Sequence, residues 1–99
     1  MTVRLEIVPT TLSTLGLGQG LSLVRHFGIT EGETVSVLLK RLVAEEARLA
    51  NNLYYPETGA LSDKVEIVLN SGLLDVKGSG LLSALKDGDR LAVVPAGGG

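Results

Sequence analysis

The chain has 99 residues, of which 44% are hydrophobic and only 3% aromatic, and its formal net charge is −2. A chain this short buries about 64% of its unfolded surface, which supports one aliphatic core but not a cofactor domain beside a substrate domain. The basic residues are scattered among acidic ones, which argues against nucleic acid as a direct partner. Cysteine is absent, which excludes disulfides, thiolate metal sites and thiol nucleophiles.

The distribution of apolar residues bears on where the protein works. Charged residues interrupt the first apolar positions, so we expect no signal peptide. No stretch approaches the roughly 18 apolar residues that span a bilayer. We therefore expect a cytoplasmic protein without a membrane partner.

The first third of the chain predicts two strands. Apolar and charged residues alternate over residues 3–7, which indicates a half-buried strand that Pro9 ends. Residues 10–20 are rich in glycine and threonine and predict a loop. Residues 21–29 predict a second, less regular strand.

The clearest element is an amphipathic helix after Thr34, whose hydroxyl can accept from an unpaired N–H of the first turn. About seventeen residues follow helical spacing, and Asn51 and Asn52 are a plausible stop. The apolar face consists of Val35, Leu38, Leu39, Leu42 and Leu49.

The second half of the chain predicts short strands separated by turns. In order, we expect a turn-rich connection at 54–59, strands at 65–69 and 73–76, a helical turn at 81–85, a tight turn at 87–88 and a last strand at 90–94 that Pro95 stops. A single amphipathic helix must bury its face against a sheet, so we predict a small α+β roll with four or five strands in one mixed sheet. We expect residues 1–95 to form this domain and residues 96–99 a flexible tail.

The polar residues do not form an enzyme-like constellation. His26 is the only histidine, and a single histidine with scattered carboxylates does not suggest a metal site. We interpret it as an ordinary strand residue. The carboxylate pairs Asp87/Asp89 and Glu31/Glu33 flank glycines in turns, where acidic residues are common for local backbone reasons.

Three alternating glycines, Gly16, Gly18 and Gly20, superficially resemble a nucleotide-binding loop. A dinucleotide fingerprint needs a helix directly after the glycines, so that the helix N-terminus meets the pyrophosphate. Here a strand is predicted to follow, which favours a simple hairpin loop.

The chain ends on Gly97, Gly98 and Gly99. On composition alone, a frayed end or an engineering scar explains them as well as a function does. A terminus without Cβ atoms can, however, pass through a narrow channel into another protein's active site. Its α-carboxylate, with a pKa of roughly 3.5, is ionised at neutral pH and can attack ATP to become an acyl adenylate. From Pro95 to Gly99 the chain reaches at most about 14–18 Å.

Residues 85–99, LKDGDRLAVVPAGGG, closely resemble the end of the ubiquitin-like sulfur carriers, where a DGD-type turn, a hydrophobic strand and a proline precede Gly-Gly. Residues 56–59 together with 65–70 are similar to archaeal-type relatives of the molybdopterin-synthase small subunit. Residues 31–39 resemble the beginning of their helix. The resemblance covers nearly the whole chain and implies a β-grasp (ubiquitin-like) roll.

The resemblance also implies a mechanism. A ubiquitin-activating-type enzyme would use ATP to adenylate Gly99, and sulfur would replace AMP to leave a thiocarboxylate on the Gly98-Gly99 end. Ala96 and Gly97 would belong to the tail. The chain would then be a carrier, or the non-catalytic small subunit of a molybdopterin-synthase-type complex, rather than an enzyme. It would bind no cofactor or metal itself, because its partner uses the ATP.

The family docks through an apolar patch on the sheet face away from the helix, which here implies Val8, Val94 and Pro95. The sulfur acceptor would be a molybdopterin or tungstopterin precursor, with thiamine synthesis or tRNA thiolation as other branches. The triple glycine departs from the usual molybdopterin-branch tail and leans towards the thiamine or modifier branches. Some relatives instead form isopeptide bonds with lysines of target proteins, so a protein modifier is the alternative function. A binding-only β-grasp domain is the third.

Overall fold

The computed structural model describes residues 1–16, 22–55 and 58–96. The elements in chain order are β1 (Thr2–Ile7), α1 (Pro9–Thr14), β2 (Leu23–Gly28), α2 (Val35–Glu45), η1 (Ala47–Leu49), α3 (Ala50–Leu53), β3 (Val65–Leu69), β4 (Gly72–Leu73), η2 (Gly80–Leu82) and β5 (Arg90–Pro95).

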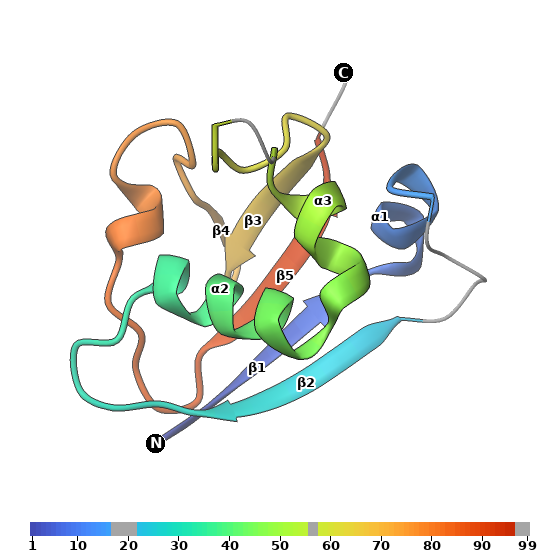
Figure 1. Cartoon of the computed structure of the whole chain (residues 1–99). Helices are drawn as coiled ribbons and strands as arrows, with labels where there is room; N and C mark the ends of the chain where they lie inside the picture. Colours follow the sequence, from blue (N-terminus) through green and yellow to red (C-terminus); the bar gives the residue numbers. More distant parts are fainter. Residues whose placement is uncertain (17–21, 56–57, 97–99) are drawn as a thin grey trace.

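The five strands form one mixed sheet in the order β2-β1-β5-β3-β4 (Figure 1). The two central strands, β1 and β5, run parallel and place Leu5 beside Leu91, whereas the other neighbouring pairs are antiparallel. The first and last parts of the chain therefore meet in the middle of the sheet. This arrangement confirms the predicted α+β class, the mixed sheet and the single main helix.

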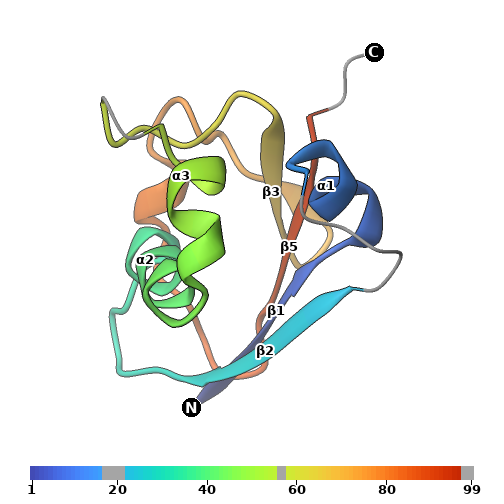
Figure 2. The ribbon, with the colours of Figure 1, turned by 45° about the vertical axis from the view of Figure 1, so that its right-hand side comes forward.

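Figure 2 shows α2 and α3 together on one side of the sheet. They cover the sheet face to which alternate residues of the central strands point, and the core between the two layers is aliphatic apart from Phe27. The fully buried side chains of this core include Leu5, Ile7, Leu38, Leu39, Leu42, Leu49, Leu53, Ile67, Leu91, Val3, Val35, Val65 and Val93.

The main helix begins as predicted and ends earlier than predicted. The Thr34 hydroxyl accepts a hydrogen bond from the Val37 N–H at 3.3 Å, which caps the first turn. Glu46 leaves helical geometry, and its carboxylate pairs with Arg25 of β2. The short segments η1 and α3 follow in place of the expected continuation and still bury Leu49. A tertiary ion pair, with no glycine or proline, thus marks the end of α2.

The predicted loop over 10–20 is wrong in its first part, because Pro9 begins the short helix α1 as well as ending β1. Proline suits the first helical position, because an N–H group there would have no hydrogen-bond acceptor within the helix. Thr11 is buried and donates its hydroxyl to the Val93 carbonyl at 2.8 Å, which attaches α1 to β5. Gly18 and Gly20 lie outside the described residues.

The predicted strand over 73–76 is shorter than expected. A turn begins at Asp75, whose backbone carbonyl accepts from the N–H groups of Gly78 and Gly80 and whose side chain also accepts from Gly78. This turn leaves only Gly72–Leu73 as β4, and the helical segment η2 begins one residue before the predicted turn at 81–85.

Candidate functional site

The Asp87-Gly88-Asp89 turn sets β5 in place beside β1. The Asp87 carboxylate accepts from the Thr2 N–H at 2.8 Å, and the Gly88 N–H donates to the Thr2 carbonyl at 2.8 Å. Gly88 has a φ of +84°, a conformation that favours glycine. Asp89 closes the turn by accepting from the Lys86 N–H at 2.8 Å. The motif that resembles the family thus fixes the register in which β5 enters the sheet.

Asn70 secures the same corner from β3. Its φ is +57°, which asparagine tolerates better than most residues. Its side-chain oxygen accepts from the Arg90 N–H at 3.1 Å, and its amide donates to the Asp89 carboxylate at 3.2 Å. Its own N–H donates to the Arg90 carbonyl at 2.7 Å. The start of β5 is therefore held from both sides.

At its other end, β5 holds the base of the tail against the body. Pro95 pairs with Val65, and the Ala96 N–H donates to the Lys64 carbonyl at 2.9 Å. The ladder therefore extends through Ala96, and Pro95 lies within the strand that it was predicted to stop. The predicted carrier residues Gly97, Gly98 and Gly99 lie outside the described residues.

The predicted docking residues lie next to one another beside the tail base. Val94 is half-buried and points away from the helices, since its neighbour Val93 is fully buried. Val8 was predicted on the first strand, but β1 ends at Ile7 and Val8 directly precedes α1. Its N–H donates to the Val93 carbonyl at 3.3 Å, which keeps it beside β5.

Strand register adds apolar residues to this surface that alternation alone did not identify. Ala92 lies opposite Val68, and Val68 lies opposite Leu73 of the edge strand β4. We call the sheet side away from α2 and α3, formed by these residues with Val8 and Val94, the outer face. Pro95, predicted as a docking residue, lies opposite the buried Val65, so strand alternation places it on the helix-covered side. Leu73 is 63% exposed. The sequence gives no signal for Leu73, because its place on this surface depends on the register of β3 and β4.

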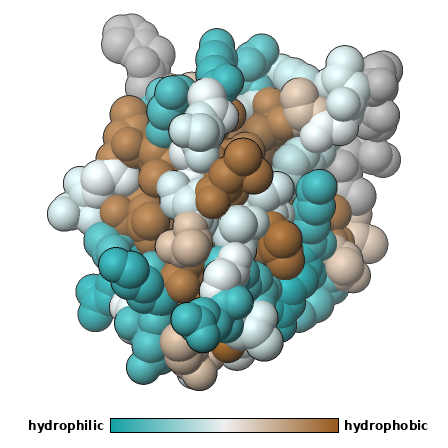
Figure 3. Space-filling model, turned by 90° about the vertical axis from the view of Figure 1, so that its left-hand side faces the viewer, coloured by the Kyte–Doolittle hydropathy of each residue, from teal (hydrophilic) through white to brown (hydrophobic). Residues whose placement is uncertain are grey.

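A second exposed leucine, Leu82, belongs to η2 and is 70% exposed. Figure 3 shows the side of the molecule that lies at the left of Figure 1, where η2 is found. Hydrophobic residues on this side form separate patches among hydrophilic ones.

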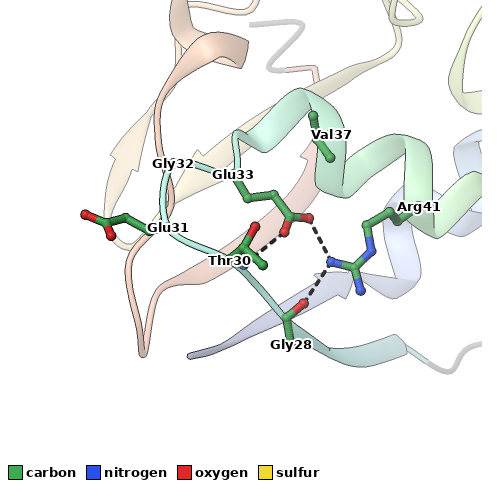
Figure 4. Close-up of a pocket in the computed structure, with 7 residues that line it drawn as sticks. All are labelled: Gly28, Thr30, Glu31, Gly32, Glu33, Val37 and Arg41. Atoms are coloured by element: carbon green, nitrogen blue, oxygen red, sulfur yellow. Dashed lines mark hydrogen bonds and ion pairs between the residues drawn. The ribbon is translucent and has the colours of Figure 1, made fainter.

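The connection between β2 and α2 forms an open pocket of about 610 Å³ around Arg41 (Figure 4). The Arg41 guanidinium donates to the Glu33 carboxylate at 2.7 Å and to the Gly28 carbonyl at 2.8 Å. The bond from Arg41, followed by the bond from the Thr30 N–H, lowers the pKa of Glu33. Glu31 points away from this cluster. The pair Glu31/Glu33 therefore does not converge on one site, and Glu33 serves the loop structure.

The other residues that the sequence analysis considered as site candidates do not form a site in the described part of the chain. His26 is an exposed residue of β2, as predicted. The strand β2, not a helix, is the first element after Gly16–Gly20. Within the described residues, no group of three or more His, Asp or Glu side chains could hold a metal ion, and no helix is long and apolar enough to cross a membrane.

This architecture is similar to that of several solved structures, although no sequence match was found. No protein-family model and no curated protein matches the sequence. Among solved structures, small archaeal modifier protein 1 from Haloferax volcanii matches with a TM-score of 0.72 and 19% identity over 100% of this chain and 99% of that chain. A putative molybdopterin converting factor subunit 1 from Pyrococcus furiosus matches with a TM-score of 0.62 and 18% identity over 96% and 97%. Mycobacterium tuberculosis CysO matches with a TM-score of 0.61 and 28% identity over 95% and 98%.

These similarities cover nearly the whole of each chain, and the sheet order and single main helix agree with them. They bear out the resemblance that the DGD turn and the glycines indicated. The chain has a ubiquitin-like β-grasp fold, similar to the folds of these proteins.

Proposed function

We propose that the chain is a sulfur carrier that is activated at Gly99. The observation that carries this proposal is the position of the tail base. Strand β5 occupies the centre of the sheet, and Ala96 is still hydrogen-bonded to the body. The reactive residue would thus be presented from a rigid base at a fixed place, as a substrate of another enzyme requires.

The chemistry proceeds in two stages on the partner enzyme. A carboxylate oxygen of Gly99 attacks the α-phosphorus of ATP, which forms the glycyl adenylate and releases pyrophosphate. The terminal sulfur of a persulfide then attacks the acyl carbon, and AMP leaves with the bonding electron pair. A further thiol cleaves the S–S bond of the acyl disulfide by forming a new disulfide, and the thiocarboxylate remains. The carrier itself binds neither ATP nor a metal in this scheme.

The length of the tail makes docking close to its base necessary. Pro95 and Ala96 are hydrogen-bonded or paired to the body, so the proposal puts the activated Gly99 at most about 10–11 Å from Ala96. The reach predicted from the sequence, about 14–18 Å, was longer because it was measured from Pro95 rather than from Ala96. The partner must therefore approach within about 10–11 Å of Ala96, and we propose that it contacts Val8, Val94 and Pro95.

For the acceptor, we propose a molybdopterin or tungstopterin precursor in the cytoplasm, with the chain as the non-catalytic small subunit of the synthase. The similarity to a putative molybdopterin converting factor subunit supports this branch. Transfer of sulfur to a thiazole precursor or to tRNA would use the same activated tail. Reconstitution with a synthase large subunit and pterin precursor tests the branch, and no pterin product from a verified thiocarboxylate would exclude it.

A protein modifier is the second candidate, supported by the similarity to small archaeal modifier protein 1. A lysine amine of the target would attack the activated Gly99 carbonyl, form an isopeptide bond and release the activating group. Pull-down of tagged chain from its native lysate should then give covalent ladders that deletion of Gly99 removes.

Mass spectrometry tests the carrier directly. Incubation with the adenylating enzyme of the same genome, ATP and a sulfur donor should add about 16 Da, since sulfur replaces one oxygen. A matched variant with one residue added after Gly99 should show no change. The proposal requires that Gly99 carry the free carboxylate, which the intact mass of the natural protein checks. An unmodified mass with every adenylating enzyme of that genome would overturn it.

A further inference from the structure

A buried threonine connects α1 to the end of β5, next to the base of the tail. The Thr11 side chain is 0% exposed and is one of two buried polar side chains among the described residues. Buried hydroxyls are normally hydrogen-bonded, and this one donates to the Val93 carbonyl at 2.8 Å. Figure 1 and Figure 2 both place α1 beside this end of β5. The bond therefore joins two elements that are distant in sequence.

The Val93 carbonyl is also where the parallel ladder between β1 and β5 ends. Its last bond runs from the Val8 N–H to this carbonyl and is 3.3 Å long. By the alternation of a parallel ladder, the next bond would run from the N–H of residue 95 to the Val8 carbonyl, but Pro95 has no N–H. The Val8 carbonyl instead accepts from the N–H groups of Thr11 and Leu12, at 3.0 and 3.2 Å. Beyond Val93, the described residues show no further hydrogen bond between β1 and β5.

The two sides of the tail base are therefore held differently. Towards β3 the ladder continues, and the Ala96 N–H donates to the Lys64 carbonyl at 2.9 Å. Towards β1 the last attachment is the Val93 carbonyl, where the bond from the Thr11 hydroxyl, at 2.8 Å, is shorter than the ladder bond of 3.3 Å to the same oxygen. Val94 follows directly and belongs to the outer face, so its position depends on this attachment.

We propose that Thr11 is a positioning residue for activation of the tail. Through the Val93 carbonyl it holds Val94 and the tail base in the place where the activating enzyme contacts them. A surface that is ordered before binding costs less free energy to dock. This inference rests on the proposed function and adds to it a residue that touches neither ATP nor the reacting carboxylate. Loss of the hydroxyl should let the end of β5 open more often, which weakens docking and leaves the chemical step unchanged.

Amide hydrogen exchange tests the position of the tail base without a partner. Thr11→Val keeps the branched shape of the side chain and removes the hydroxyl, so the Ala96 N–H should exchange roughly two- to tenfold faster. The Asn70 N–H, which bonds the Arg90 carbonyl at the other end of β5, should keep its rate. Thr11→Ser retains the hydroxyl and should keep the Ala96 rate near that of the wild type. Equal acceleration at both ends of β5, or none at Ala96, would overturn the proposal.

Steady-state kinetics tests the consequence for the reaction. With an active adenylating enzyme, Thr11→Val should raise the KM for the carrier roughly two- to tenfold with kcat unchanged, and Thr11→Ser should retain the wild-type KM. Thr14→Val is the matched control, because the Thr14 hydroxyl donates to the Thr10 carbonyl within α1 at 2.9 Å. An unchanged KM for Thr11→Val, or an equal effect of Thr14→Val, would refute the role of Thr11. A wild-type chain that is never adenylated would refute the proposed function, and the exchange comparison would still decide whether Thr11 holds the tail base.

Discussion

The two faces of the sheet differ in what they contribute to the molecule. On β5, Leu91 and Val93 point to the helices and are 1% and 0% exposed, whereas Ala92 and Val94 point outward and stay half-buried. The buried apolar residues of the strands all point to the helix-covered face. The outer face contains an apolar area around Val94 and the charged residues Arg4, Glu6 and Arg90 towards the start of β5. Folding therefore needs only one face, and the other is available to a partner.

The largest expected effect is on stability and comes from the covered face. Leu5→Ala removes a fully buried side chain between β1 and the helices, and should lower the free energy of unfolding by about 2–5 kcal/mol. Urea denaturation followed by circular dichroism measures it. The matched change Val94→Ala on the outer face should cost less than about 1 kcal/mol. Similar losses in both variants would contradict the division of roles between the faces.

The second expected effect is on the reaction with the partner enzyme, and here we expect the outer face to be more sensitive than the covered face. Val94→Asp places a charge in the apolar area beside the tail base and should lower the carrier's kcat/KM with its adenylating enzyme by roughly 10–100-fold. The unfolding free energy should change by less than about 1 kcal/mol. Ser36→Asp, on the helix layer, controls for net charge and should leave kcat/KM unaltered. An undiminished kcat/KM for Val94→Asp would remove Val94 from the docking surface.

Asn70 joins the two faces at the start of β5 and should give an intermediate effect on stability. Asn70→Ala removes two side-chain hydrogen bonds and strains a backbone with φ of +57°, so we expect a loss of about 1–3 kcal/mol. Asn70→Gly relieves the strain while it removes the same bonds, and should therefore lose less. Thermal and urea unfolding compare the variants. Equal losses would show that the hydrogen bonds alone matter.

Much of the fold could be predicted from local patterns. The strand at 65–69 was predicted with its observed bounds, because its β-branched run has clear turn residues after it. The helix start at Thr34 was predictable from its capping hydroxyl. Its end was not, because the ion pair between Glu46 and Arg25 joins residues that are distant in sequence. The helix α1 was missed because Pro9 was interpreted only as the end of a strand.

The candidate site divides in the same way. The outward position of Val94 was predicted from strand alternation, whereas the predicted glycine tail lies outside the described residues. The contribution of Leu73 could not be predicted, because it depends on which strands are neighbours and in what register. The order β2-β1-β5 results from packing across the whole sheet. Alternation predicts which side of a strand a residue takes but not what stands beside it.

The smallest expected effects concern two carboxylates, one associated with each face. The Arg41 hydrogen bond lowers the pKa of Glu33 in the helix layer, and the Ser22 hydrogen bond, followed by the Arg4 bond, lowers the pKa of Glu6 on the outer face. A folded-state pKa below the ordinary value of 4.5 stabilises the protein above that value, and this contribution is lost as the pH falls through the folded pKa.

Urea unfolding between pH 7 and pH 3 should therefore show that Glu33→Gln and Glu6→Gln each flatten the acid decline of stability. The Glu33 side chain is 10% exposed and that of Glu6 is 25% exposed, so solvent screens the Glu6 interactions more and its effect should be the smaller. A larger effect from Glu6 would mean that the outer face, which α2 and α3 do not cover, stabilises charge more strongly than the covered layer. The contrast between the two faces would then hold for apolar packing alone.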